Sequence, residues 1–213
     1  AVGTAEHGSK PALSRLFKLS DMKNECSIAT FFKAETLTFH FNKSGNALLV
    51  KTQTSIDKTG SSYYGQTHVY YQTQNGKYDC NIVLPDNPKI YDLQWHPSGK
   101  SFLVIYGKTP NCHATSFNVK AEEIHTIQNL PINTARYNPQ GTLLMLGGFG
   151  SMAGYMYFYD LKSDELVGKA NAHGCAINEW SPNGRLFLTG IIYQRLKVNN
   201  GFKVWKYTGD MLS

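Results

Sequence analysis

Charged side chains are scarce in this sequence. Only 17% of its 213 residues are Asp, Glu, Lys or Arg, whereas about 25% is usual for a globular domain. Hydrophobic residues make up 41% and aromatic residues 13%. This balance excludes a disordered tail and a charged linker, because such segments bury too little apolar surface to fold. The aromatic residues, together with 19 Gly and 8 Pro, favour strands and turns over helices.

Paired cysteines and a leader segment are also lacking. Cys26, Cys80, Cys112 and Cys175 form no C-x-x-C pair, which is not the pattern of a secreted disulfide scaffold. We therefore expect reduced thiols, no secretory signal and a cytoplasmic protein. Cys112 and His113 are adjacent, but two further ligands at metal spacing are missing, so no metal site is predicted.

One long segment carries no charge, from Tyr137 to Tyr159. Its length is that of a membrane helix. However, Pro139 lies near its start and five glycines interrupt it. Two strands and a glycine-rich loop explain the segment better, and no membrane partner is predicted.

Enzyme motifs are absent or incomplete. The run 148–153 matches the dinucleotide fingerprint G-x-G-x-x-A, but that fingerprint requires a helix directly afterwards, and 155–159 is typical of a strand. The sequence contains no P-loop and no G-x-S-x-G elbow. We therefore predict no cofactor and no enzymatic activity.

The most prominent feature of the sequence is a repeat. Four segments end in the same five-position pattern. An aromatic residue comes first, a polar residue second, usually Pro third, another polar residue fourth and Gly last. The segments are Leu37–Gly45, Tyr91–Gly99, Asn133–Gly141 and Ala176–Gly184. The final glycines are 54, 42 and 43 residues apart. Proline and glycine at these places favour a tight hairpin turn. The aromatic residues Phe41, Trp95, Tyr137 and Trp180 are expected to be largely buried.

The strands around each turn predict the fold class. An apolar strand follows every glycine, a third strand comes next, and a fourth follows in the first three units. Four strands in each period of 42 to 54 residues are typical of β-propeller blades. The Trp-Asp dipeptide of WD repeats is degenerate, reading Tyr71-Gln72, Phe117-Asn118, Tyr159-Asp160 and Trp205-Lys206. We predict an all-β, WD40-like propeller of four-stranded antiparallel blades.

The repeat also predicts the domain organisation. We expect one partial propeller domain over 1–213, about four and a half blades long, because open strand edges invite pairing with more chain. The predicted boundaries are an irregular segment at 1–11, a partial blade at 12–35, and blades at 36–84, 90–130, 131–175 and 176–213.

Candidate binding residues lie in the loops between second and third strands, which together we name the long-loop face. These loops hold the cations Lys58, Lys108, Arg195 and Lys197. Tyr63, Tyr64 and Tyr193 lie beside them. Basic groups with interleaved aromatic rings can bind phosphate and stack on bases, and the net charge of +6 permits an RNA partner. Solvated loops with packed tyrosines are the simpler interpretation.

Three segments carry a family resemblance. Asp57–Gly65, Gly147–Gly150 and Arg195–Gly209 are similar to the propeller of the eukaryotic translation initiation factor 2A family, and the similarity extends from Ala12 to Leu212. The resemblance implies a nine-bladed propeller in a cytoplasmic, non-enzymatic initiation factor. It implies small ribosomal subunit binding, initiator methionyl-tRNA delivery to selected mRNAs, and other initiation factors as partners. A protein–protein scaffold, such as the propeller of a large initiation factor 3 subunit, is the alternative.

Overall fold

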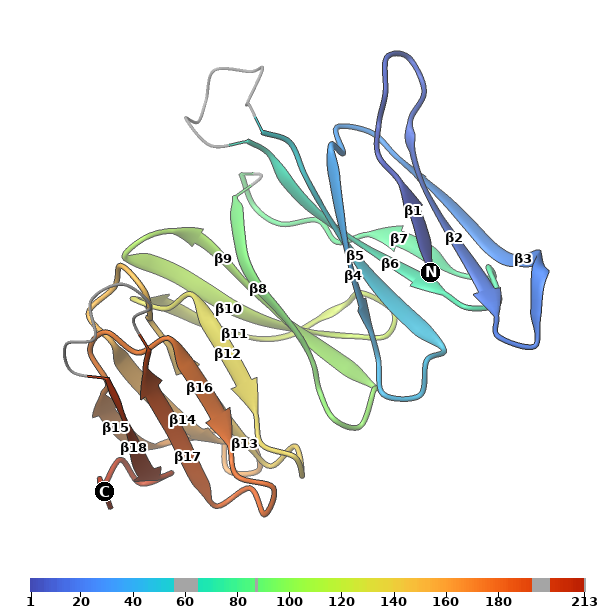
Figure 1. Ribbon diagram of the computed structural model, residues 1–213. Coiled ribbons are helices and arrows are strands. Elements are labelled where there is room, and N and C mark those ends of the chain that lie inside the picture. Colours follow the sequence, from blue (N-terminus) through green and yellow to red (C-terminus); the bar gives the residue numbers. More distant parts are fainter. Residues whose placement is uncertain (56–64, 87, 193–199, 213) are drawn as a thin grey trace. The chain divides into compact units, whose positions relative to one another are not determined.

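The computed structural model describes residues 1–55, 65–86, 88–192 and 200–212. Within these ranges every regular element is a β-strand, and the strands form five sheets, as Figure 1 shows. The all-β prediction is confirmed. The chain divides into two compact units, one formed by 1–90 with 118–122 and the other by 91–117 with 123–213.

The first unit contains two sheets. The first of them consists of β1 (Val2–Thr4), β2 (Ala12–Lys18) and β3 (Asp21–Phe31). The second consists of β4 (Thr36–Phe41), β5 (Ala47–Gln53), β6 (Thr67–Thr73) and β7 (Asp79–Asn81). Successive strands pair antiparallel in both sheets.

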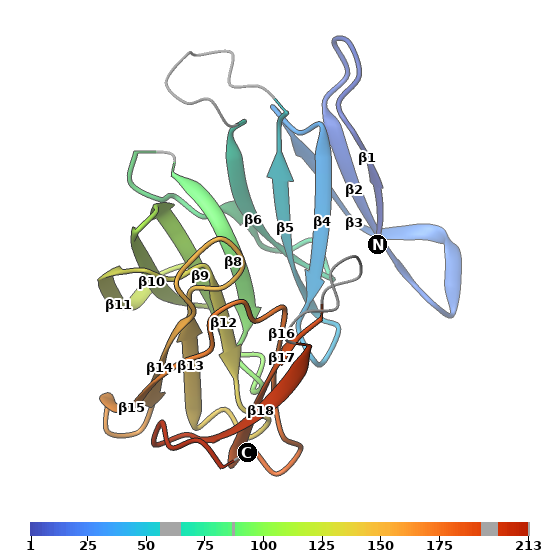
Figure 2. The same cartoon turned by 60° about the vertical axis from the view of Figure 1, so that its left-hand side comes forward.

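These two sheets pack face to face, and Figure 2 shows β2 and β3 beside β4 and β5. Alternate residues of the strands point into the shared core, where Phe31, Leu48 and Val50 are almost completely buried. A buried polar cluster completes the packing. The Ser14 hydroxyl donates to Gln72 Oε1, and Gln72 Nε2 donates to Ser27 Oγ at 2.8 Å. Gln72 stands where a standard WD repeat has Asp, so this degenerate position still makes a structural contact.

The second unit contains three sheets. The first consists of β8 (Lys89–Trp95), which begins at the unit boundary, β9 (Ser101–Lys108), β10 (Asn111–Asn118) and β11 (Glu123–Leu130). The next consists of β12 (Thr134–Tyr137), β13 (Leu143–Gly147), β14 (Tyr155–Asp160) and β15 (Glu165–Asn171). The last consists of β16 (Ile177–Trp180), β17 (Leu186–Ile191) and β18 (Gly201–Lys206).

Two apolar clusters hold these three sheets together. One joins the β8–β11 sheet to the β12–β15 sheet around Ile105 and Leu146. The other joins the β12–β15 sheet to the β16–β18 sheet around Phe158, Phe187 and Trp205. Packing of successive antiparallel sheets face to face is the arrangement of propeller blades, so the predicted fold class is confirmed.

The four repeated turns share one geometry. The N–H of each turn glycine donates to the carbonyl three residues earlier, at 2.8 to 3.0 Å. All four glycines have φ between 68° and 71°, a region that other residues enter at a cost. The polar residue that opens the turn also caps it. Asn138 Oδ1, for example, accepts from the N–H groups of Thr142 and Leu143.

Within the second unit each turn is linked to the next. His96 Nε2 donates to the carbonyl of Gly141 at 2.8 Å, and Asn138 Nδ2 donates to the carbonyl of Gly184 at 3.3 Å. His96 therefore carries its proton on Nε2, because a carbonyl only accepts. Sheets that are more than 40 residues apart in sequence are thus joined turn to turn.

Two expectations need correction. The segment 1–11 is not wholly irregular, because β1 lies in it and pairs with β2. Phe41 is 45% exposed, since it ends β4 beyond the apolar cluster that holds Phe39. The expectation for Trp95, Tyr137 and Trp180 is confirmed, because most of each side chain is removed from solvent. The Trp180 ring packs nearly perpendicular to the rings of Phe158 and Phe187, and its Nε1 donates to the carbonyl of Arg136.

Asn138→Ala should lower the free energy of unfolding by about 1–3 kcal/mol, because the buried N–H of Leu143 and the partly buried N–H of Thr142 lose their acceptor and the link to Gly184 is broken. Chemical denaturation of the variant measures this. Asn183→Ala is the control, since Asn183 is exposed in the neighbouring turn. Equal losses in the two variants would contradict a special role for the Asn138 cap.

Candidate functional site on the long-loop face

The structure describes one of the four predicted cations. Lys58, Arg195 and Lys197 lie outside the described residues. Lys108 ends β9 and is exposed, and it forms no ion pair with the described residues. The structure therefore places one predicted residue on the long-loop face and leaves the grouping of all four as a prediction.

The loop that carries Lys108 is shorter than expected. β9 extends through Lys108 and β10 already begins at Asn111, so only Thr109 and Pro110 connect the strands. Gly107 is required at this bend, because its φ is 128° and a Cβ there would lie 3.0 Å from the carbonyl oxygen of Asn111. The bend presents Lys108 to solvent at the end of a tight hairpin.

The glycine-rich loop between β13 and β14 is held in place by Asn133. The Asn133 side chain donates to the carbonyl of Phe149 at 2.9 Å and accepts from the N–H of the same residue at 3.0 Å. Phe149 is buried in the core. A strand, β14, follows the loop where the dinucleotide fingerprint requires a helix. The glycines therefore belong to a structural loop and not to a dinucleotide-binding fingerprint.

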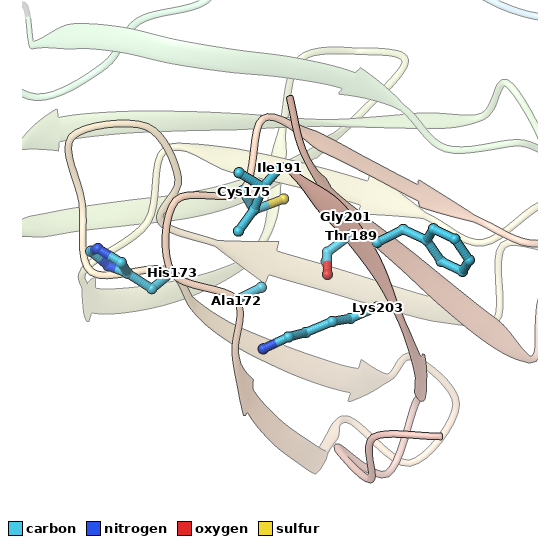
Figure 3. Close-up of a pocket in the computed structure, with 8 residues that line it drawn as sticks. Ala172, His173, Cys175, Thr189, Ile191, Gly201 and Lys203 are labelled. Atoms are coloured by element: carbon cyan, nitrogen blue, oxygen red, sulfur yellow. The ribbon is translucent and has the colours of Figure 1, made fainter. Parts of the chain in front are cut away.

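A small cavity of about 100 Å³ lies on the long-loop face of the second unit. The connection from β15 to β16 forms one side of it, and the facing ends of β17 and β18 form the other (Figure 3). The residues that line it are Ala172, His173, Cys175, Thr189, Ile191, Gly201, Phe202 and Lys203.

The polar atoms of the cavity wall are already engaged. The Cys175 thiol donates to the carbonyl of Ile177 at 2.7 Å, and Thr189 Oγ1 accepts from Trp205 Nε1 at 2.8 Å. Burial raises the pKa of the Cys175 thiol, so the thiol stays protonated and is a poor nucleophile. The wall can therefore hold an inserted apolar group by packing, but it provides few groups for hydrogen bonding or nucleophilic attack.

Charge lies at the rim of the cavity. Lys203 is exposed, and its ammonium lies 5.8 Å from the centroid of the Trp205 ring. In Figure 3 its side chain extends toward Ala172. His173 also lines the cavity and is exposed. No acidic residue is among the lining residues, so the rim attracts negative charge.

Metal and membrane features are both missing from the residues with described positions. Among them, no three His, Cys, Asp or Glu side chains are grouped so as to hold a metal ion. Nor does that part of the chain include a helix with the length and apolar character needed to cross a membrane.

The cavity could not be predicted from the sequence. Its lining comes from three separate segments, around Ala172, Thr189 and Gly201, and none of them carries a local motif. Only the alternation along β18, which places Lys203 and Trp205 on one side of the strand, was a usable signal.

The stacked sheets and their repeated turns define a β-propeller protein. A solved structure described as "Structure of Dos1 propeller" is 15% identical with a TM-score of 0.60, covering 95% of this chain and 53% of that one, which concerns the fold alone. A structure described as "Crystal structure of the eukaryotic initiation factor" is 28% identical with a TM-score of 0.84, covering 99% of this chain and 50% of that one.

The sequence comparisons identify the family. The family model described as eukaryotic translation initiation factor eIF2A matches residues 29–213. The Dictyostelium discoideum eukaryotic translation initiation factor 2A is 39% identical over 97% of this chain and 33% of its own length. The corresponding Saccharomyces cerevisiae protein is 33% identical over 98% of this chain and 34% of its own length. The chain belongs to the eIF2A family of eukaryotic translation initiation factors.

A second group of relatives is more distant. A subunit of eukaryotic translation initiation factor 3 from Xenopus laevis is 26% identical over 89% of this chain and 28% of its own length. The chain spans about a third of the length of the curated relatives that it matches.

Proposed function

We propose that this chain is a propeller part of a non-enzymatic, cytoplasmic initiation factor that binds the small ribosomal subunit and assists initiator methionyl-tRNA delivery to selected mRNAs. The observation that carries the proposal is the eIF2A family match, with 39% identity over 97% of the chain to the Dictyostelium relative. Further initiation factors would be its partners, and the propeller would supply a rigid surface rather than a catalytic centre.

The long-loop face is the proposed contact surface, with Lys58, Lys108, Arg195 and Lys197 as phosphate ligands. Lys108 supports it, because its ammonium is exposed and unpaired among the described residues. Contacts to phosphate position a protein on RNA without reading its bases, so we expect no sequence preference from these four residues.

Arg195→Ala with Lys197→Ala should weaken co-sedimentation with purified small ribosomal subunits and flatten its dependence on salt. Each lost phosphate contact removes about 0.7–0.9 from the slope of log affinity against log salt concentration. Lys43→Ala with Lys100→Ala is the matched control, because it removes the same charge from two exposed turn residues. A double variant that binds normally but melts earlier would assign Arg195 and Lys197 a structural role instead.

A protein–protein scaffold of the initiation factor 3 kind is the second candidate. The similarity to the Xenopus subunit of that factor over 89% of the chain favours it. Such a scaffold would co-purify with other initiation factors without binding isolated ribosomal subunits, and its associations would survive the loss of the four cations.

A further inference from the structure

The cavity beside β17 and β18 has the size of a single aliphatic side chain. Its volume is about 100 Å³, whereas an apolar cavity of about 150 Å³ accommodates benzene. Ligand pockets for whole cofactors or nucleotides are about 300–1,000 Å³. A leucine, isoleucine or valine side chain therefore fits the cavity, and a nucleotide does not.

The wall of the cavity suits an apolar guest. Ala172, Cys175 and Thr189 are at most 4% exposed, so a side chain entering the cavity meets well-packed protein atoms. The thiol of Cys175 and the oxygen of Thr189 already share hydrogen bonds with Ile177 and Trp205. A nucleobase would lose its hydrogen bonds to water there and find few replacements, whereas an aliphatic group loses none.

The rim adds a preference for a carboxylate. Lys203 forms no ion pair with the described residues, and neither it nor His173 faces an acidic lining residue. An Asp or Glu next to the inserted side chain would meet the ammonium of Lys203 at the surface. Anchor side chains in small pockets, surrounded by polar rim contacts, are typical of protein–protein interfaces.

We propose that this cavity is a docking site for a partner protein segment that inserts one aliphatic side chain and pairs an adjacent carboxylate with Lys203. The proposal uses Lys203, which is not one of the four cations of the proposed RNA contact. It goes beyond the proposed function, because it would give the same propeller a protein partner whether or not those cations bind the ribosome.

Gly201 offers a direct test. A Cβ at Gly201 meets nothing within 4 Å, and its φ lies outside the left-handed region. Gly201→Val should therefore fill space at the cavity without displacing other atoms. Because Gly201 begins β18 and valine favours a strand more than glycine does, the melting temperature of the variant should stay the same or rise. A fall in melting temperature would show that the space is not free.

The probe is the peptide acetyl-Ser-Leu-Asp-Ser-amide, titrated into the isotope-labelled 213-residue chain and followed by NMR. We expect shifts at Thr189, Gly201 and Lys203. Gly201→Val, or replacement of the peptide leucine by serine, should weaken binding by about tenfold or more, since burying a leucine contributes about 1.5–3 kcal/mol. Lys203→Glu should weaken it about two- to fivefold, as expected for an exposed ion pair.

Lys206→Glu is the matched control, because it makes the same charge change on the same strand at a residue that does not line the cavity. It should leave the affinity for the peptide unchanged. A peptide with lysine in place of aspartate should prefer the Lys203→Glu variant. Equal losses in both charge variants, or no shifts at the cavity up to about 10 mM peptide, which corresponds to about −3 kcal/mol, would overturn the proposal. So would a uridine hexanucleotide that shifts these residues when the peptide does not.

Discussion

Truncation of Phe158 to alanine should lower the free energy of unfolding by about 3–5 kcal/mol. Phe158 is completely buried in the cluster that joins the β12–β15 sheet to the β16–β18 sheet. Its ring packs edge-on against Trp180 and Phe187, with centroids 5.7 and 5.6 Å away. Alanine would leave a cavity between two sheets, and the aromatic contacts on both sides would be lost.

Chemical denaturation of the variant measures this loss. Tyr155→Ala is the control, since Tyr155 lies on the same strand and is 50% exposed; it should cost clearly less. Trp180→Ala should fall between the two, because Trp180 is only partly buried. If Tyr155→Ala were as costly as Phe158→Ala, the packing of these two sheets would differ from the one described.

Gly154→Ala should lower the free energy of unfolding by about 3 kcal/mol, the second large effect. Gly154 has a φ of 84°, and a Cβ there would lie 2.6 Å from both the carbonyl oxygen of Ala172 and the N–H nitrogen of His173. A left-handed conformation costs a residue with a Cβ about 1–2 kcal/mol. The close neighbours are backbone atoms, which cannot change rotamer as a side chain can. Overpacking therefore adds about 1–3 kcal/mol to the loss of stability.

Gly45→Ala separates the two causes. Gly45 has a φ of 69°, but a Cβ there meets nothing within 4 Å, so only the conformational cost applies. Thermal or chemical unfolding of the two variants should show a markedly larger loss for Gly154→Ala. Because Ala172 and His173 also line the cavity, that variant should disturb peptide binding as well. Equal losses for the two glycines would show that the Ala172 backbone yields easily.

The turns could be predicted from the sequence because their chemistry is local. Proline, glycine and a capping side chain lie within five residues of one another, and together they determine the hairpin. The exposure of Phe41 could not be predicted in the same way. It depends on where the apolar cluster between the two sheets ends, and the residues of the turn do not determine that.

The two parts of the candidate site also differ in whether the sequence could predict them. A run of basic and aromatic residues is visible in a sequence, so Lys58, Lys108, Arg195 and Lys197 could be proposed from it. They remain predictions apart from the exposed position of Lys108. The cavity lined by Ala172, Thr189 and Gly201 arises only when three strands or connections are brought together by sheet pairing, so no local pattern announces it.

The turn-to-turn links of the second unit have a consequence for how such a chain can change length. His96 and Asn138 link each turn to the next by hydrogen bonds. An insertion in one of these turns would therefore break the bond that joins its sheet to the neighbouring sheet. The connections between second and third strands vary more in length. Two residues connect β9 to β10, whereas thirteen separate β5 from β6. The spacing of the turn glycines is 42 and 43 residues in this unit but 54 before it, and the extra length lies in the segment between β5 and β6. The scaffold can therefore lengthen these connections while the repeated turns keep one length.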